Sequence, residues 1–138
     1  MLNIAEIAIK DDSFTLLADG LLSTNLIITF KQSGPFTLFA PNDEAFAQID
    51  PIILTGLIAD NHSLQKVSLS HAVKGKYMLA DLIDLDVLSS MEGCDIYINA
   101  NRFDVRVNNS VVTLGDIECS NGVIHVIDSI HFPSIFDF

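Results

Sequence analysis

The side chains of this chain that could transfer protons, attack as nucleophiles or bind metals are four histidines, eighteen acidic residues and two cysteines. The sequence contains no G-x-S-x-G turn for a serine nucleophile, no H-E-x-x-H pair for zinc and no glycine-rich phosphate loop. Asp84-Leu85-Asp86 comes closest to a calcium loop, but the glycine and the distal glutamate of such a loop are missing. We therefore expect a protein that is not an enzyme and that binds no cofactor or metal ion.

Two of the histidines lie in apolar surroundings. His71 falls on an apolar helical stripe, and His125 lies within the apolar run from Val123 to Ile127. A histidine in such a position is usually a core residue whose hydrogen bonds are satisfied. We expect both rings to be buried and structural, whereas His62 lies in a polar stretch and is expected to be exposed.

The two cysteines, Cys94 and Cys119, have neither C-x-x-C spacing nor nearby histidine ligands, which argues against a zinc site. We expect them to be free thiols. A disulfide stays open as the alternative, because it needs an oxidising compartment and α-carbons within about 7 Å of one another.

Composition limits the class of protein. The chain has 138 residues, 49% of them hydrophobic, and a net charge of −11, which together indicate one folded, acidic domain. A chain this acidic repels a polyanion, so nucleic acid is not an expected partner. The longest nearly apolar run, Ile52 to Ala59, is too short to span a bilayer. No signal-peptide pattern opens the sequence, so a cytoplasmic location and a removed signal peptide both stay open.

The first half of the chain has helical patterning with one strand. Ser13 and Ser63 are expected to be the N-caps of two helices, and Asn42 the N-cap of a third. Pro51 is expected to open a helix at its first position. The Gly34-Pro35 turn is followed by an apolar run, Phe36 to Ala40, which predicts a buried strand.

Past residue 86 the hydrophobic period becomes two, which is typical of strands. The pair Asn108-Asn109 lies between two such stretches and predicts a hairpin, because asparagine tolerates the positive φ of primed turns. Helices first and strands afterwards indicate an α+β fold.

Three segments resemble conserved motifs of the fasciclin-like domain family. Phe36 to Phe46, FTLFAPNDEAF, resembles the first motif, and Asp116 to Pro133, DIECSNGVIHVIDSIHFP, resembles the second. Leu69 to Leu82, LSHAVKGKYMLADL, is similar to the family's central histidine segment. Their order and spacing also fit, so we expect residues 1–138 to form a single fasciclin-like domain.

The resemblance implies a helical N-terminal half packed on a wedge of two β-sheets, and it implies that Asn25 to Phe30 is helical despite its strand-forming residues. We interpret the motif residues as mainly structural, because they lie in expected buried strands, at a helix start and in a tight turn. Those that we expect to maintain the fold are Thr37, Phe39, Pro41, Asn42, Asp43, Phe46, Asn121, Gly122, His125 and Asp128.

The resemblance also implies two candidate partner-binding sites. In animal members an Asp-Ile pair before the second motif takes part in integrin recognition, and here that pair is Asp116-Ile117. An exposed carboxylate suits the metal ion that an integrin carries, so we expect Asp116 to be accessible and Ile117 partly buried. The second site is the central segment, where the family often has Tyr-His and this chain has Ser70-His71.

Members of the family are chiefly secreted or surface-attached modules for adhesion, and no catalytic activity is characteristic of them. The resemblance therefore predicts a non-catalytic, monomeric adhesion or protein-interaction module outside the cytoplasm, which binds a protein partner or a cell-surface receptor. A carrier of an apolar ligand, such as a carotenoid or a lipid, and a structural cell-envelope protein are the alternatives.

Overall fold

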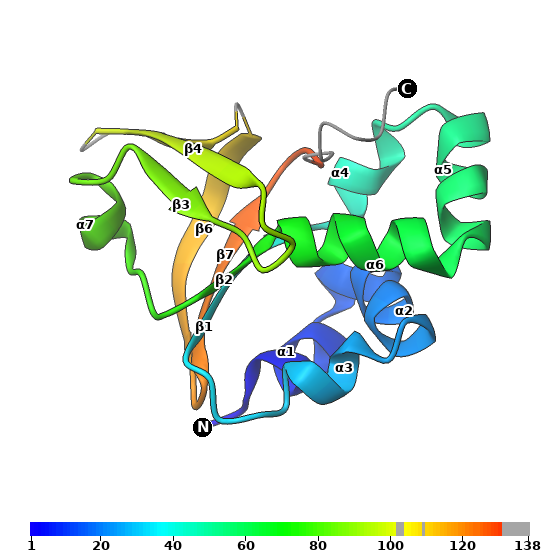
Figure 1. The fold of residues 1–138 in the computed structure, drawn as a ribbon, viewed down its shortest axis with the longest axis horizontal. Coiled ribbons are helices and arrows are strands. Elements are labelled where there is room, and N and C mark those ends of the chain that lie inside the picture. Colours follow the sequence, from blue (N-terminus) through cyan, green and yellow to red (C-terminus); the bar gives the residue numbers. More distant parts are fainter. Residues whose placement is uncertain (102–103, 109, 131–138) are drawn as a thin grey trace.

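The computed structural model describes residues 1–101, 104–108 and 110–130 (Figure 1). The helices are α1 (Ile4–Lys10), α2 (Thr15–Ser23), α3 (Leu26–Thr29), α4 (Asp43–Ala47), α5 (Pro51–Ala59), α6 (Asn61–Ser70) and α7 (Leu79–Leu82), with a 3-10 turn at Asp12–Phe14. The strands are β1 (Phe36–Pro41), β2 (Ala72–Lys74), β3 (Val87–Ser89), β4 (Asp95–Ala100), β5 (Val105–Val107), β6 (Ser110–Cys119) and β7 (Gly122–Ile127). The predicted α+β class and the change from helices to strands are confirmed.

The strands follow the order β2-β1-β7-β6-β5-β4-β3. β1 and β7 are parallel, and the other neighbours are antiparallel. The two sheets of the expected wedge are joined through β6, which pairs with β5 near its start and with β7 along most of its length. Register shifts in β6 let the sheet bend, so that β3 and β4 stand over β2 and β1 (Figure 1).

The parallel pair β1–β7 is buried on both faces, which explains why both strands are almost continuously apolar. One face packs against the helical half through side chains such as Phe36, Leu38 and Ile124. The other face packs inside the wedge, where Phe39 and Ile127 contact side chains of β3, β4 and β5. The two central strands therefore separate two hydrophobic cores.

Asn121, in the turn before β7, connects the sheet to the helical half. Its Oδ1 accepts a hydrogen bond from the Ile4 amide at 2.9 Å, and its Nδ2 donates to the carbonyls of Phe30 and Gln32 at 2.7 and 2.8 Å. The side chain is almost fully buried, so each of these bonds satisfies a group that water cannot reach. One asparagine thus fixes the start of α1 and the chain that leads into β1.

The helix starts agree with the sequence in part. Asn42 caps α4 through the Ala45 amide, Pro51 opens α5, and Leu26–Thr29 is helical, as predicted. The N-caps expected at Ser13 and Ser63 are wrong.

Ser13 lies in the 3-10 turn, and the first turn of α2 is capped by a side chain from another part of the sequence. The carboxylate of Asp43 accepts hydrogen bonds from the Leu16 amide at 2.9 Å and the Thr15 hydroxyl at 2.6 Å. At α6 the cap is Asp60, whose carboxylate accepts from the amides of His62 and Ser63. Aspartate is an equally good cap and offers two oxygens, so it displaces the serine.

Cys94 and Cys119 are free thiols, as predicted. Burial raises the pKa of the Cys119 thiol to about 11, so this side chain behaves as a small hydrophobic group of the helical core. At the predicted hairpin, Asn108 has the expected positive φ of 47°, and Asn109 lies outside the described residues.

Two glycines predict opposite effects of the same substitution. A Cβ at Gly122 would overlap the carbonyl oxygen of Phe36, because β1 and β7 approach each other there, whereas Gly56 lies in α5 with open space around it. Gly122→Ala should lower the free energy of unfolding by about 3 kcal/mol or more. Gly56→Ala should raise it by about 0.5–1 kcal/mol, because alanine favours the helix.

Urea unfolding of the two variants measures both changes. Equal stability of Gly122→Ala and the parent protein would show that β1 and β7 do not meet as described.

Candidate functional site

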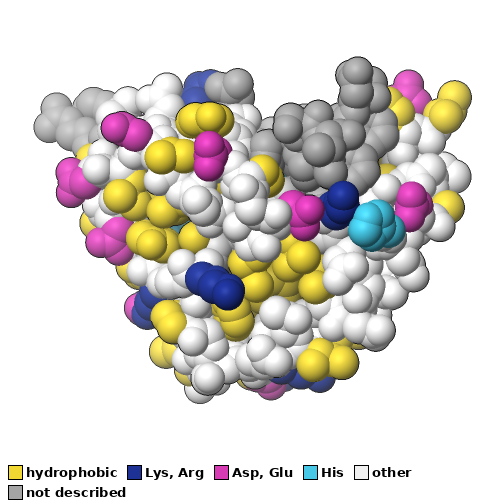
Figure 2. Space-filling model, in the orientation of Figure 1, with side chains coloured by type: hydrophobic (Ala, Val, Ile, Leu, Met, Phe, Trp, Pro, Cys, Tyr) yellow, Lys and Arg dark blue, Asp and Glu magenta, His cyan; other side chains and the backbone are white. Residues whose placement is uncertain are grey.

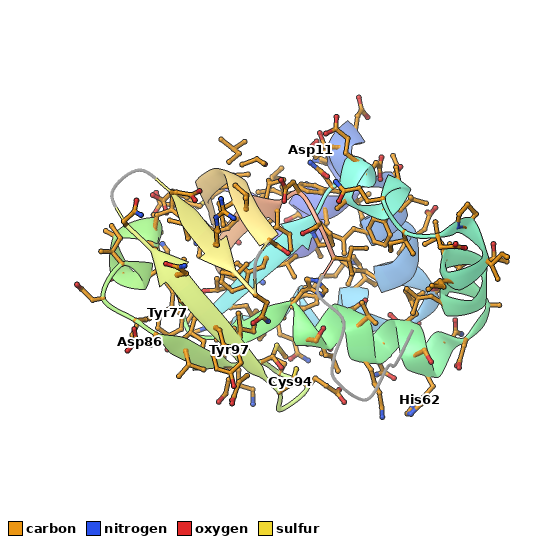
Figure 3. The ribbon with its side chains drawn as sticks, turned by 90° about the horizontal axis from the view of Figure 1, so that it is seen from above. Asp11, His62, Tyr77, Asp86, Cys94 and Tyr97 are labelled. Carbon is orange, nitrogen blue, oxygen red and sulfur yellow. The ribbon has the colours of Figure 1, made fainter. Side chains whose placement is uncertain are left out.

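A chain of hydrogen bonds on the wedge face of β7 links the sheet to the segment before α7. At its centre lies His125, whose side chain is fully buried and stacks on the Phe39 ring with the centroids 5.7 Å apart. The Asp116 amide donates to Nδ1 of His125 at 3.0 Å, and Nε2 lies 2.7 Å from the Tyr77 carbonyl. Figure 3 labels Tyr77 on the side of the molecule that carries the strands.

These two contacts assign the proton of the imidazole. Nδ1 faces an N–H group and must accept, so the proton is on Nε2, which donates to the Tyr77 carbonyl. Burial is the main cause that lowers the pKa of His125, and the Tyr77 carbonyl and the Asp116 charge oppose it in part. The ring therefore serves as a neutral bridge between β6 and the segment at Tyr77.

Thr37, on β1, holds the same segment from the other side. Its hydroxyl donates to the Gly75 carbonyl at 2.7 Å and accepts from the Tyr77 amide at 2.9 Å. Thr37 is fully buried, and a valine of similar shape would leave both backbone groups without these partners. The chain after β2 is thus fixed to two neighbouring strands.

Asp116 continues the connection to the surface. It has a φ of 58° and lies where the register of β6 shifts, and its Oδ1 accepts from the Leu79 amide at 2.8 Å. Aspartate is among the residues that tolerate this left-handed conformation. At Gly115 a Cβ would overlap the Leu79 side chain, so the glycine lets α7 lie directly on β6. The backbone around the carboxylate is therefore held in place from both sides.

A groove of about 360 Å³ lies beside Asp116, between α7 and strands β5 and β6. Its apolar wall includes Leu79 and Ile83, and Ile83 is 45% exposed. Asp116 itself is exposed and Ile117 is half-buried against the helical core, as predicted from the sequence. The arrangement presents a fixed carboxylate next to an apolar surface.

The central pair has a different environment. Ser70 and His71 are both buried, and the Ser70 hydroxyl and Nδ1 of His71 both contact the Val67 carbonyl. The space that they line holds about 10 Å³, which is room for about one water molecule. The predicted burial of His71 is confirmed, and the structure does not bring this pair to the surface beside Asp116.

The remaining motif residues lie at junctions of the fold. Phe46 is part of the helical core, Pro41 ends β1, and Asp128 accepts from the Val111 amide at 3.1 Å. The last residues of the second motif, 131–133, lie outside the described part of the chain.

Sequence reasoning missed the contributions of Tyr77, Leu79 and Gly115. Tyr77 acts through its backbone, and no residue pattern indicates a backbone acceptor. Gly115 did carry a signal, because a glycine inside a strand pattern often marks a bulge or a close approach.

Within the described residues no three metal-binding side chains cluster together. None of the helices in that part of the chain is both long and apolar enough to cross a bilayer.

Comparison with known proteins identifies the family. The family model of the fasciclin domain matches residues 12–133. The chain is 40% identical to the uncharacterized protein sll1735 of Synechocystis sp. over 130 residues. This alignment covers 94% of this chain and 97% of that protein. The chain is 26% identical over 132 residues to the transforming growth factor-beta-induced protein ig-h3 of Sus scrofa, covering 95% of this chain and 19% of that protein. The chain belongs to the fasciclin domain family.

A solved structure agrees with the fold. The FAS1 domain pair from the insect cell adhesion molecule fasciclin I matches with a TM-score of 0.85 at 17% identity, over 97% of this chain and 52% of that chain. The expected resemblance is confirmed by sequence and by structure.

His125 predicts a specific pH dependence of stability. Its folded-state pKa lies below the unfolded value of about 6.5, so the unfolded chain takes up the proton first as the pH falls. The stabilisation is complete above about pH 6.5 and declines as the pH falls from there through the folded pKa. His125→Gln should remove this part of the pH dependence and cost about 1–3 kcal/mol at neutral pH.

Denaturant unfolding at a series of pH values measures the effect. His62→Gln, at an exposed histidine, is the matched control and should follow the parent curve. If His125→Gln and the parent protein lose stability in parallel on acidification, the neutral bridge is not present.

Proposed function

We propose that this fasciclin domain is a non-catalytic module that binds a protein partner through the surface around Asp116. The observation that carries the proposal is an exposed carboxylate that is held at two points: the Asp116 amide donates to His125, and Oδ1 of the carboxylate accepts from the Leu79 amide. A group that is already ordered loses little conformational entropy on binding. Nothing in this arrangement needs a chemical step.

The surroundings of Asp116 suit a protein partner. Oδ1 is occupied by the Leu79 amide, and in the described part of the chain Oδ2 has no hydrogen bond, so it is available to a cation or an N–H donor of a partner. Ile83 and Leu79 add apolar area in the adjoining groove. An acid beside apolar side chains combines orientation with buried area, as binding sites on proteins commonly do.

Adhesion outside the cytoplasm is the setting that the comparisons support. One matching structure comes from the insect cell adhesion molecule fasciclin I. The family resemblance also implies that Asp116-Ile117 corresponds to the Asp-Ile pair that takes part in integrin recognition in animal members. We propose that residues 1–138 act as one such domain and that the partner is a surface protein that coordinates the carboxylate.

A carrier of an apolar ligand is the weaker alternative. The space beside Ser70 and His71 is too small for any ligand, and the grooves among the described residues are open to solvent. Carotenoids and lipids are mostly apolar and favour sites that enclose most of their surface.

The test replaces the charge and keeps the geometry. Asp116→Asn retains an oxygen for the Leu79 amide and a residue that tolerates the left-handed backbone. We expect its melting temperature to stay near that of the parent protein while attachment of cells to the immobilised domain falls about tenfold or more.

Glu118→Gln removes another exposed acid of β6 and is the matched control, for which attachment should not change. Normal attachment to a folded Asp116→Asn variant would contradict the proposed site, whatever the result for Glu118→Gln.

A further inference from the structure

Among the residues that the structure describes, the strand order leaves two sheet edges, β2 at one end and β3 at the other. The bend of the sheet brings these edges to the same groove, which has a volume of about 460 Å³ and is lined by residues of both strands. Figure 2 shows apolar side chains on the surface of this strand-rich side, with charged groups around them. An unpaired edge presents backbone donors and acceptors that another strand can use.

The pairing of β3 shows which of its backbone groups face the groove. The Ser90 amide donates a hydrogen bond to the Cys94 carbonyl, and the Ile98 amide donates one to the Asp86 carbonyl, both at 2.8 Å. Because hydrogen-bonding direction alternates along an antiparallel strand, residues 86, 88 and 90 face β4. The N–H and C=O groups of Val87 and Ser89 therefore point to the open edge, and both residues are exposed.

The same alternation applies to β2. Phe39 donates to the His71 carbonyl, and Gly75 donates to the Pro35 carbonyl, so residues 71, 73 and 75 face β1. Ala72 and Lys74 point outward. The Ala72 carbonyl accepts from the Met91 amide at 2.7 Å, which ties the two edges together at one point.

Beyond that tie the edges are not joined. In the described part of the chain no hydrogen bond connects Lys74 with Val87 or Ser89. The floor between them is apolar, because Val73 and Leu88 belong to the wedge core and Tyr77 and Met91 line the same groove. The groove thus combines outward backbone groups on its walls with a hydrophobic floor.

We propose that this groove binds an extended peptide segment of a partner protein, which adds a strand to the edge of β3 and lies beside β2. The outward backbone groups of Val87, Ser89 and Lys74 have no partner among the described residues. The N–H and C=O groups of an extended segment would pair with them. Alternate side chains of a strand point to one face, so the segment has apolar residues toward the floor and polar residues toward solvent. A helix would satisfy its own backbone groups and leave these unpaired.

This surface is separate from the one around Asp116. The peptide groove is lined by β2, β3 and the turn at residues 91–93, whereas Asp116 lies on β6 beside α7. The two proposals can therefore fail independently.

The experiment follows amide hydrogen exchange by NMR in the intact domain, with and without a synthetic peptide. The probe is about six residues long, alternates valine with threonine, and is capped at both ends. We expect exchange at the Val87, Ser89 and Lys74 amides to slow by about threefold to tenfold, while the Leu88 amide, already paired with β4, does not change. Asp116→Asn should bind the probe as the parent protein does.

Two controls isolate the backbone. The same peptide with every amide N-methylated keeps its side chains and should not slow exchange. Ser89→Pro removes an outward N–H without breaking the ladder to β4 and should weaken binding about tenfold, whereas Ser89→Ala should bind normally. If Ser89→Pro does not fold, the methylated peptide alone decides the question.

The proposal is overturned if the parent domain shows no slowing at these amides, or if the methylated peptide produces the same slowing. It is also overturned if exchange slows only around α7.

Discussion

The arrangement of the wedge, and of the surface around Asp116, depends on the buried imidazole of His125. It can accept on one side and donate on the other only when it is neutral and in one tautomer, and both partners are backbone groups. One partner is the Asp116 amide, and the other lies in the segment that leads to α7. A buried polar group without its partner costs more than the bond itself contributes, so the strand, the bulge and the helix are held in one arrangement.

A second buried polar side chain, in the turn that precedes β7, makes the connection on the helical side of the sheet. Asn121 joins the helical half to the turn before β7, and His125 joins β7 to the wedge. Hydrophobic burial on both faces supplies most of the stability, but it is non-directional and does not set register. These two side chains fix how the helices and the wedge are placed relative to the central strands.

Much of the fold could be predicted from the sequence, because its signals are local. The apolar run of β1, the Asn42 cap and the change of period after residue 86 all depend on neighbouring residues. The predicted N-caps at Ser13 and Ser63 were wrong because an aspartate caps each helix start instead. One of these aspartates, Asp43, is distant in sequence from the helix that it caps. The accessible Asp116 could be predicted from a family motif, but its bulge and its bond to Leu79 could not, since they arise from contacts between segments remote in sequence.

The most direct test of this account is the protonation state of the His125 ring in the folded protein, read from its ¹⁵N chemical shifts across a pH titration. We predict a proton on Nε2, an unprotonated Nδ1 and a pKa below the ordinary value of about 6.5. A ring with its proton on Nδ1, or one that becomes charged above that value, would contradict it.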